Sequence, residues 1–366
     1  MAACFVAFAG RGITTTHVLW RETTFEHTRD ITRVAFAQTY QAARAIYAPR
    51  AATPIVLLGN SRIWLGAPAP LVNAALATRR PDEPAAVNLG IFGAGLGDLE
   101  ALSRHVGRVD PSLAVLTLGT SDLLGSTSTP LSGVPARLLR IGWDGEPVGD
   151  ASLADRLDRW LRTLWPLYRF REFARAAIDD RLVPSADVSP LSRRLSSPAF
   201  HIASTRDLFE TAYGARGGEI EAAYERWRGH PTLASFVAYV ETLNPSHLEL
   251  VRQRVRESGP VDPEGPGLRL VDAILARLAP AGRTVVVLMP ENPILAEDTR
   301  QEFHRAGYSD EAAAEVLAAA RAHDVPLLDA RAWMPARAFL DFDHLLPDLS
   351  GFQERLAEEI VHVLDD

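Results

Sequence analysis

Short, unbroken apolar runs recur along the chain, and each is closed by Gly, Pro or Asp. The runs cover residues 54–58, 85–89, 113–118, 284–289 and 325–328. Such runs are typical of strands buried on both faces. Apolar positions at helical spacing lie between several of them or follow the last, at 98–106, 309–323 and 351–364. This alternation predicts an α/β fold, a doubly wound parallel sheet covered by helices on both faces in three layers.

The middle of the chain follows a different pattern. No buried-strand run appears between about 140 and 279, whereas helical spacing covers 155–178, 219–228, 232–243 and 245–258. We interpret residues 140–279 as a mainly helical insertion between the third and fourth strands. The α/β domain is then expected in two parts, residues 51–139 and 280–366.

Residues 1–50 precede the predicted sheet. The stretch 1–10 is apolar and small, and Arg11 ends it. A membrane-spanning helix needs about 20 apolar residues, and the basic start of a signal peptide is missing. Two interpretations stay open, the remnant of a longer membrane anchor and a plain buried segment. A helix is predicted over 22–48, before Pro49.

Composition narrows the function classes. The chain has 366 residues, of which 47% are hydrophobic, enough for a sizeable core. It carries 46 acidic and 38 basic residues, a formal charge of −8, which argues against a nucleic-acid partner. The single cysteine, Cys4, allows no internal disulfide, and no zinc-site spacing is present.

Polar residues follow the predicted strands, at the edge where parallel sheets bind ligands. Asn60-Ser61-Arg62 follows the first strand, a glycine-rich turn at 90–95 the second, and Thr120-Ser121-Asp122 the third. Asp341 and His344 come after the fifth. A hydroxyl, a base, a carboxylate and backbone N–H groups are what acyl transfer through a serine requires. Taken singly, Ser61 also suits a helix N-cap, and Arg62 suits either an anionic substrate or a salt bridge to Asp122.

In this order, four blocks resemble the SGNH (GDSL-like) hydrolase superfamily. They are Gly59-Asn60-Ser61, Asn88-Leu-Gly90-x-x-Gly93, Gly119-x-Ser121-Asp122 and Asp341-x-x-His344. More narrowly, they resemble SGNH-like proteins associated with acylation of bacterial cell-surface polysaccharide. The resemblance covers residues 51–125 and 280–366, and it implies a flavodoxin-like SGNH fold.

The resemblance also implies roles. Ser61 would be the nucleophile, His344 the general base and then acid, and Asp341 the carboxylate that orients the histidine. The backbone N–H groups of Ser61 and Gly93 would form part of the oxyanion hole. Two positions depart from the family pattern: Asn60 stands where Asp is usual, and Ser121 stands where an asparagine usually completes the oxyanion hole.

Three hypotheses of function follow. The first is a serine esterase or O-acyltransferase that acts on a carbohydrate or cell-surface glycan through an acyl-serine, with Arg62, Asn60 and Asp122 binding substrate. The second, motivated by Ser121, is a non-catalytic carbohydrate-binding or assembly protein. The third is a metal-dependent phosphoesterase, but the three ligands Asp341, Asp343 and His344 lie within four residues and are not expected to converge on one ion.

Serine-based acyl chemistry implies no organic cofactor and no metal. The expected partner is a carbohydrate or an acylated small molecule, with membrane association through the N-terminus. The resemblance and the apolar start favour an extracytoplasmic, periplasmic or membrane-associated location, and the cytoplasm is the alternative.

Overall fold

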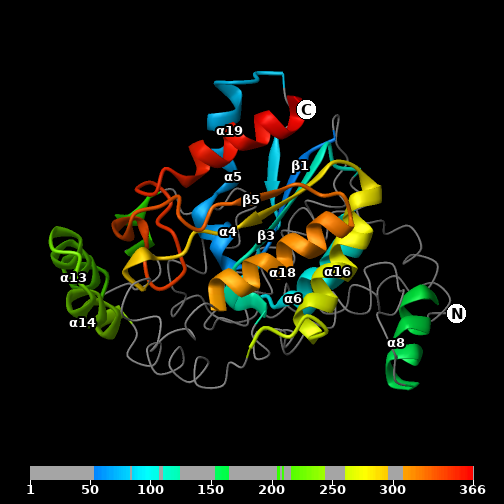
Figure 1. The fold of residues 1–366 in the computed structure, drawn as a ribbon, viewed down its shortest axis with the longest axis horizontal. Helices are drawn as coiled ribbons and strands as arrows, with labels where there is room; N and C mark the ends of the chain where they lie inside the picture. Colours follow the sequence, from blue (N-terminus) through cyan, green and yellow to red (C-terminus); the bar gives the residue numbers. More distant parts are fainter. Residues whose placement is uncertain are drawn as a thin grey trace, which may run out of the picture.

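The computed structural model describes residues 53–82, 85–106, 110–123, 153–164, 204–206, 208–209, 216–243, 260–295 and 308–365. Its centre is a five-stranded sheet in the order β2-β1-β3-β4-β5 (Figure 1). The strands are β1 (Ile55–Leu58), β2 (Ala86–Asn88), β3 (Leu113–Leu118), β4 (Thr284–Leu288) and β5 (Leu327–Asp329). Every neighbouring pair is parallel. The predicted α/β class and parallel sheet are confirmed, and this strand order is one of the two common doubly wound orders.

Helices cover both faces of the sheet. One face carries α6 (Leu96–Val106), α16 (Pro266–Leu278) and α18 (Tyr308–Ala322). The other carries α5 (Ala69–Ala77) and α19 (Phe352–Asp365). Alternate strand residues feed the two apolar cores, which explains why the strands read as unbroken apolar runs.

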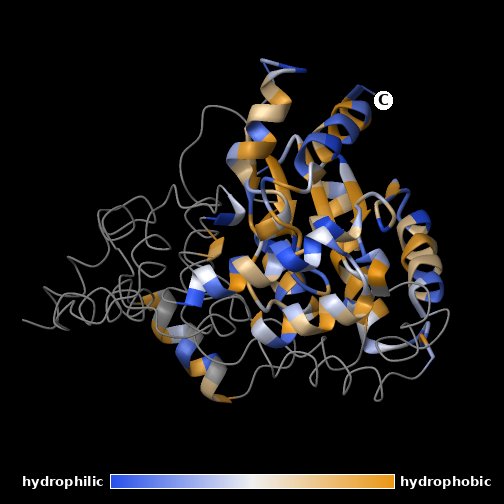
Figure 2. Ribbon diagram, turned by 90° about the vertical axis from the view of Figure 1, so that its left-hand side faces the viewer, coloured by the Kyte–Doolittle hydropathy of each residue, from blue (hydrophilic) through white to orange (hydrophobic). Residues whose placement is uncertain are grey.

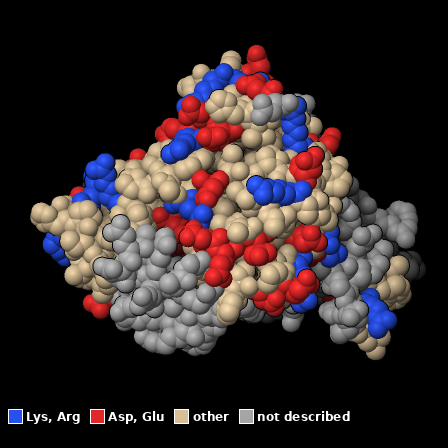
Figure 3. Space-filling model, viewed as in Figure 1, with Lys and Arg blue, Asp and Glu red and all other residues tan. Residues whose placement is uncertain are grey.

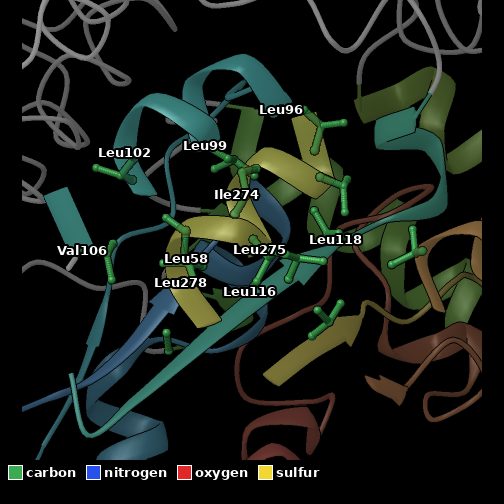
Figure 4. Packing of buried hydrophobic residues seen from close by; sticks show 14 of the residues in the cluster. Leu58, Leu96, Leu99, Leu102, Val106, Leu116, Leu118, Ile274, Leu275 and Leu278 are labelled. Atoms are coloured by element: carbon green, nitrogen blue, oxygen red, sulfur yellow. The ribbon is translucent and has the colours of Figure 1, made fainter. Parts of the chain in front are cut away.

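Leucine and isoleucine side chains fill the space between the sheet and the first group of helices. Figure 4 shows Leu58, Leu116 and Leu118 of the strands lying against Ile274 and Leu275 of α16. Each of these five side chains is at most 1% exposed. The hydropathy colouring gives the same picture, with the strands apolar and the outer helix faces polar (Figure 2).

The helix α16 is the main element that the sequence pattern missed. It falls inside the predicted 140–279 insertion, yet its apolar face packs in the core of the sheet. It is the crossover helix that leads into β4, because Ala279–Ala281 (η4) and one turn are all that separate them. The remaining domain boundaries stay predictions.

Two further helices of the middle region pack against each other and against the sheet domain. These are α13 (Gly217–Gly229) and α14 (Leu233–Leu243), both predicted, and both supply aromatic side chains to a third apolar cluster. The helix α8 (Leu153–Leu164) instead exposes Leu153, Leu157, Trp160 and Leu164, by 49–78%. Within the described ranges, no helix is both long and apolar enough to cross a membrane. The predicted helices at 22–48 and 245–258 lie outside the described residues, as does the second half of 155–178.

The face on which α16 and α18 lie carries many acidic side chains among fewer basic ones (Figure 3). This distribution agrees with the formal charge of −8.

Candidate active site

Ser61 begins α4 (Ser61–Gly66) directly after β1. In the sheet order, β1 has β2 on one side and β3 on the other, so the crossovers change direction here. Ligands of open α/β sheets bind outside the strand ends at such a point. Asn60 caps the helix, since its Oδ1 accepts a hydrogen bond from the backbone N–H of Arg62 at 3.0 Å.

Three side chains form a continuous hydrogen-bonded chain. His344 Nε2 lies 2.7 Å from Ser61 Oγ. On the other side of the ring, His344 Nδ1 lies 2.9 Å from each carboxylate oxygen of Asp341. When Nδ1 carries the proton, it donates to Asp341 and leaves Nε2 as the acceptor for the serine hydroxyl. The residues predicted as nucleophile, base and orienting carboxylate are thus brought together.

The loop that carries Asp341 and His344 is fixed by several contacts. Asp341 Oδ1 accepts the backbone N–H groups of Asp343 at 3.1 Å and His344 at 2.9 Å. Asn292, which is 2% exposed, donates from Nδ2 to the Asp341 carbonyl at 3.2 Å. The ring of Phe92 stacks on the His344 ring with centroids 5.9 Å apart. Asp341 and His344 are therefore held in a fixed mutual geometry.

Arg62 is the buried centre of a second polar cluster. Its Nε and Nη2 donate to Asp343 Oδ2 at 3.0 and 2.7 Å, Nη2 also donates to Ser121 Oγ, and Nη1 lies 3.5 Å from Asp122 Oδ1. Asn60 Nδ2 donates to the same Asp122 oxygen at 3.0 Å. The predicted salt bridge to Asp122 is present, and Asp343 is a stronger partner that the sequence reasoning did not assign. Since Asn60, Arg62 and Asp122 hold one another, their predicted contact with substrate stays a prediction.

Gly119 makes room for this cluster. A Cβ at Gly119 would lie 1.2 Å from Arg62 Nη1, so a larger residue must displace the guanidinium. We expect Gly119→Ala to destabilise the fold by about 1–3 kcal/mol through this clash. Urea denaturation measures it, with Gly218→Ala as the control because no atom lies within 4 Å of a Cβ there. Equal stabilities of the two variants would show that the Arg62 side chain can adopt another position without loss of stability.

The predicted oxyanion residues lie at the same edge. Ile91 forms a parallel bridge with Asn60, which brings the turn that contains Gly93 beside the start of α4. Gly93 has a φ of +72°, a conformation that favours glycine. Ser121 Oγ accepts a hydrogen bond from Arg62 Nη2, so the arginine fixes where this hydroxyl lies.

Asn88 of β2 and Asn292 after β4 also lie near strand ends, but the amide of each is engaged in the fold. Asn88 Nδ2 donates to the carbonyls of Ile63 and Ala67 at 2.9 and 2.8 Å, so it ties β2 to α4. Asn292 holds the Asp341 loop. Both amides therefore have structural partners, and Ser121 remains the side-chain candidate.

Charges at the site shift one another's proton affinities. Burial lowers the pKa of His344, but Asp341 and Asp343 outweigh burial and raise this pKa to about 10. Burial raises the pKa of Asp343, but Arg62 and His344 hold it well below its usual range. Burial also lowers the pKa of Arg62, and the two aspartates more than compensate. For Asp122, burial is the largest influence and raises the pKa. The raised pKa of His344 favours its protonated form at neutral pH.

A cavity of about 370 Å³ opens beside the Arg62–Asp343 pair, at the ends of β3, β4 and β5. Its volume lies in the usual range for ligand pockets. Glu291 forms part of the wall and accepts hydrogen bonds from the Ser309 hydroxyl at 2.9 and 2.8 Å. Arg331 Nη1 donates to Ser309 at 2.9 Å. None of the three was assigned a site role from the sequence: Glu291 and Arg331 follow the ends of β4 and β5 but belong to no motif, and Ser309 lies in α18, away from any strand end.

The loop that carries Asp341 and His344 also contains a candidate metal cluster. Ligand atoms of Asp341, Asp343 and His344 lie within 4.8 Å of one another, so the expectation that they cannot converge is wrong. The Asp341 carboxylate accepts the backbone N–H groups of Asp343 and His344, which folds the loop tightly and brings the three side chains together. However, the Arg62 guanidinium lies 2.7 Å from Asp343, and both ring nitrogens of His344 are already bonded. The donor set fits a hydrogen-bonded triad better than a cation site.

The helices of the middle region support this loop from outside. The rings of Phe236 and Phe342 meet edge to face with centroids 5.4 Å apart. Tyr224 donates from its hydroxyl to the Arg337 carbonyl at 2.9 Å. Trp227, 1% exposed, stacks on Tyr239 in the same cluster.

We expect Trp227→Ala to cost about 3–5 kcal/mol of stability, because it empties the centre of this cluster. Thermal or urea unfolding measures the loss, and Trp160→Ala on the exposed face of α8 is the matched control. A loss in Trp227→Ala no larger than in the control would contradict the packing described here.

Comparison with protein-family models and with curated proteins finds no match for this chain. The interpretation of the site therefore depends on its geometry and on the residue blocks that carry it.

Proposed function

We propose that the protein is a serine-dependent esterase or O-acyltransferase with Ser61 as the nucleophile. The observation that carries the proposal is the chain Ser61–His344–Asp341, with links of 2.7 and 2.9 Å. Triads of this kind are recognised by geometry and roles rather than by sequence position. The strand order and the place of Ser61 after β1 also support membership of the SGNH-like hydrolases.

The mechanism begins when neutral His344 takes the proton of the Ser61 hydroxyl at Nε2. Ser61 Oγ forms a bond to the carbonyl carbon of an acyl ester, and the carbonyl oxygen becomes an oxyanion. Backbone N–H groups of Ser61 and Gly93, with the Ser121 hydroxyl, are the proposed donors to this oxyanion. One such donor contributes about 3–4 kcal/mol. His344 then protonates the leaving alcohol, and an acyl-serine results.

The second half-reaction decides between the two activities. Water attacks the acyl-serine in an esterase, and an acceptor hydroxyl attacks it in a transferase, with His344 as base in both. Following the resemblance, we propose a carbohydrate or surface glycan as the acceptor or the acylated substrate, and an extracytoplasmic or membrane-associated location.

Trapping the acyl-enzyme tests this proposal. Incubation with an aryl acetate should release the phenol and add one acetyl group to Ser61, seen by intact mass and peptide mapping. Adding a panel of soluble oligosaccharides separates the two activities, because an acceptor that receives acetyl identifies a transferase and free acetate alone identifies an esterase. A folded protein that neither releases phenol nor gains mass would favour the non-catalytic alternative.

A further inference from the structure

The histidine of the site has a second carboxylate that the triad does not require. Asp343 Oδ1 lies 3.0 Å from His344 Nδ1, almost as near as the two Asp341 oxygens at 2.9 Å. A ring nitrogen carries one hydrogen, so it cannot be well aligned with both carboxylates at once. The two aspartates therefore compete for the same N–H.

The two carboxylates are held by different groups. Asp341 is held by the backbone N–H groups of its own loop and has a side chain that is 7% exposed. Asp343 is held by Arg62, which binds Oδ2 and leaves Oδ1 for the histidine. Arg62 contacts one carboxylate oxygen of Asp343 and His344 contacts the other, so Arg62 fixes the position of Asp343 and leaves its contact with His344 intact.

We propose that Asp343 is a positioning residue that shares His344 Nδ1 with Asp341 and thereby sets the pH range in which Ser61 becomes a nucleophile. This inference rests on the proposed function and deepens it. Asp341 orients the ring, whereas Asp343 adds a second negative charge that stabilises the imidazolium. The resting triad is then held with His344 protonated, and it is activated as the pH rises.

The charged groups around His344 are consistent with this role. Asp341 and Asp343 belong to its own loop, Ser61 comes from α4, and Phe92 from the turn after β2 contributes an uncharged stacked ring. Arg62 contacts Asp343, and the charges of Asp122 and Glu291 act on Arg62 in turn. The pKa of His344, raised to about 10 by the two aspartates, agrees with the short contacts of Nδ1 to both carboxylates.

Asp343 also lies at the wall of the cavity, where its side chain is 36% exposed. Asp341 is not among the cavity-lining residues. Of the two carboxylates that face His344 Nδ1, Asp343 is therefore the one that also lines the cavity.

The test is the pH dependence of Ser61 modification by a fluorophosphonate in wild type and in Asp343→Asn. Only neutral His344 activates the serine, so the wild-type rate should rise about tenfold per pH unit from pH 7 and level off near the histidine pKa. Removing the Asp343 charge should move the midpoint down by about one to three pH units. The rate at pH 7 should then rise about tenfold or more, with a similar alkaline plateau.

Two matched variants separate this effect from others. Asp272→Asn removes a carboxylate that pairs with the surface histidine His323, and it should leave the profile unchanged. Asp341→Asn should depress the rate at every pH, because it removes the residue that orients the ring. An Asp343→Asn profile with the wild-type midpoint, or depressed at every pH as in Asp341→Asn, would overturn the inference.

A direct titration keeps the inference testable if Ser61 does not react. The C–H resonance of His344, assigned by its loss in His344→Gln, should titrate well above pH 7 in wild type and lower in Asp343→Asn. Unreactive Ser61 together with this difference would contradict only the proposed function. Equal midpoints in the two proteins would contradict the role of Asp343, whatever the activity.

Discussion

Ser61→Ala is expected to reduce kcat for ester hydrolysis by about 10⁴- to 10⁶-fold, because it removes the atom that forms the acyl-enzyme. His344→Ala should cause a loss of the same order, since the serine hydroxyl then has no base at 2.7 Å. The measurement is the rate of phenol release from an aryl acetate, with folding checked by circular dichroism.

The double variant Ser61→Ala/His344→Ala makes this prediction sharper. Residues that act as one unit lose activity together, so the double variant should be no worse than either single variant. Ser235→Ala, in α14 and away from the site, is the control for serine replacement in general; its half-buried hydroxyl bonds Thr232 and the His230 carbonyl. Two small, additive losses in the single variants would contradict a shared catalytic role.

Arg62→Met is expected to destabilise the fold by about 3–5 kcal/mol. The arginine side chain is 7% exposed, and its loss leaves Asp122, with an 11% exposed side chain, and Asp343 without their main cationic partner. The free energy of unfolding from urea denaturation measures the effect. Arg321→Met on the exposed face of α18 is the control and should stay within about 0.5 kcal/mol of wild type.

The cause of this loss can be separated from lost packing. Methionine keeps much of the arginine stem, so the main damage should be uncompensated charge. Adding Asp122→Asn and Asp343→Asn to Arg62→Met should therefore restore part of the stability. No recovery in the triple variant would indicate that packing of the guanidinium, and not its charge, stabilises the cluster.

The sheet was predictable because its three central strands, β1, β3 and β4, are buried along their whole length. That environment leaves an unbroken apolar run in the sequence, and all five runs lie at or beside strands in the structure. The fifth strand, Leu327–Asp329, begins two residues later than its run, because Val325 packs in the core ahead of the strand. The helix α16 was missed since Pro and Gly residues crowd its start, where Pro266 in fact occupies the first turn.

The candidate site likewise contains residues that the sequence predicts and residues that it does not. Ser61, Asp341 and His344 follow strand ends or share a short spacing, so the topology of a parallel sheet already places them at one edge. The second role of Asp343 depends on the direction of its two oxygens, one toward Arg62 and one toward His344. Glu291 and Arg331 follow the ends of β4 and β5, so the same topology places them at this edge. Their shared partner, Ser309 of α18, depends on contacts between residues far apart in the chain, which sequence spacing does not show.

The most direct test of the central claim is modification of the purified wild-type protein by a fluorophosphonate across pH 7 to 10, with the labelled residue mapped by mass spectrometry. The account predicts one modification, on Ser61, that is faster at higher pH and absent from Ser61→Ala. A folded wild-type protein that stays unlabelled throughout this range, or that is labelled on another residue, would contradict it.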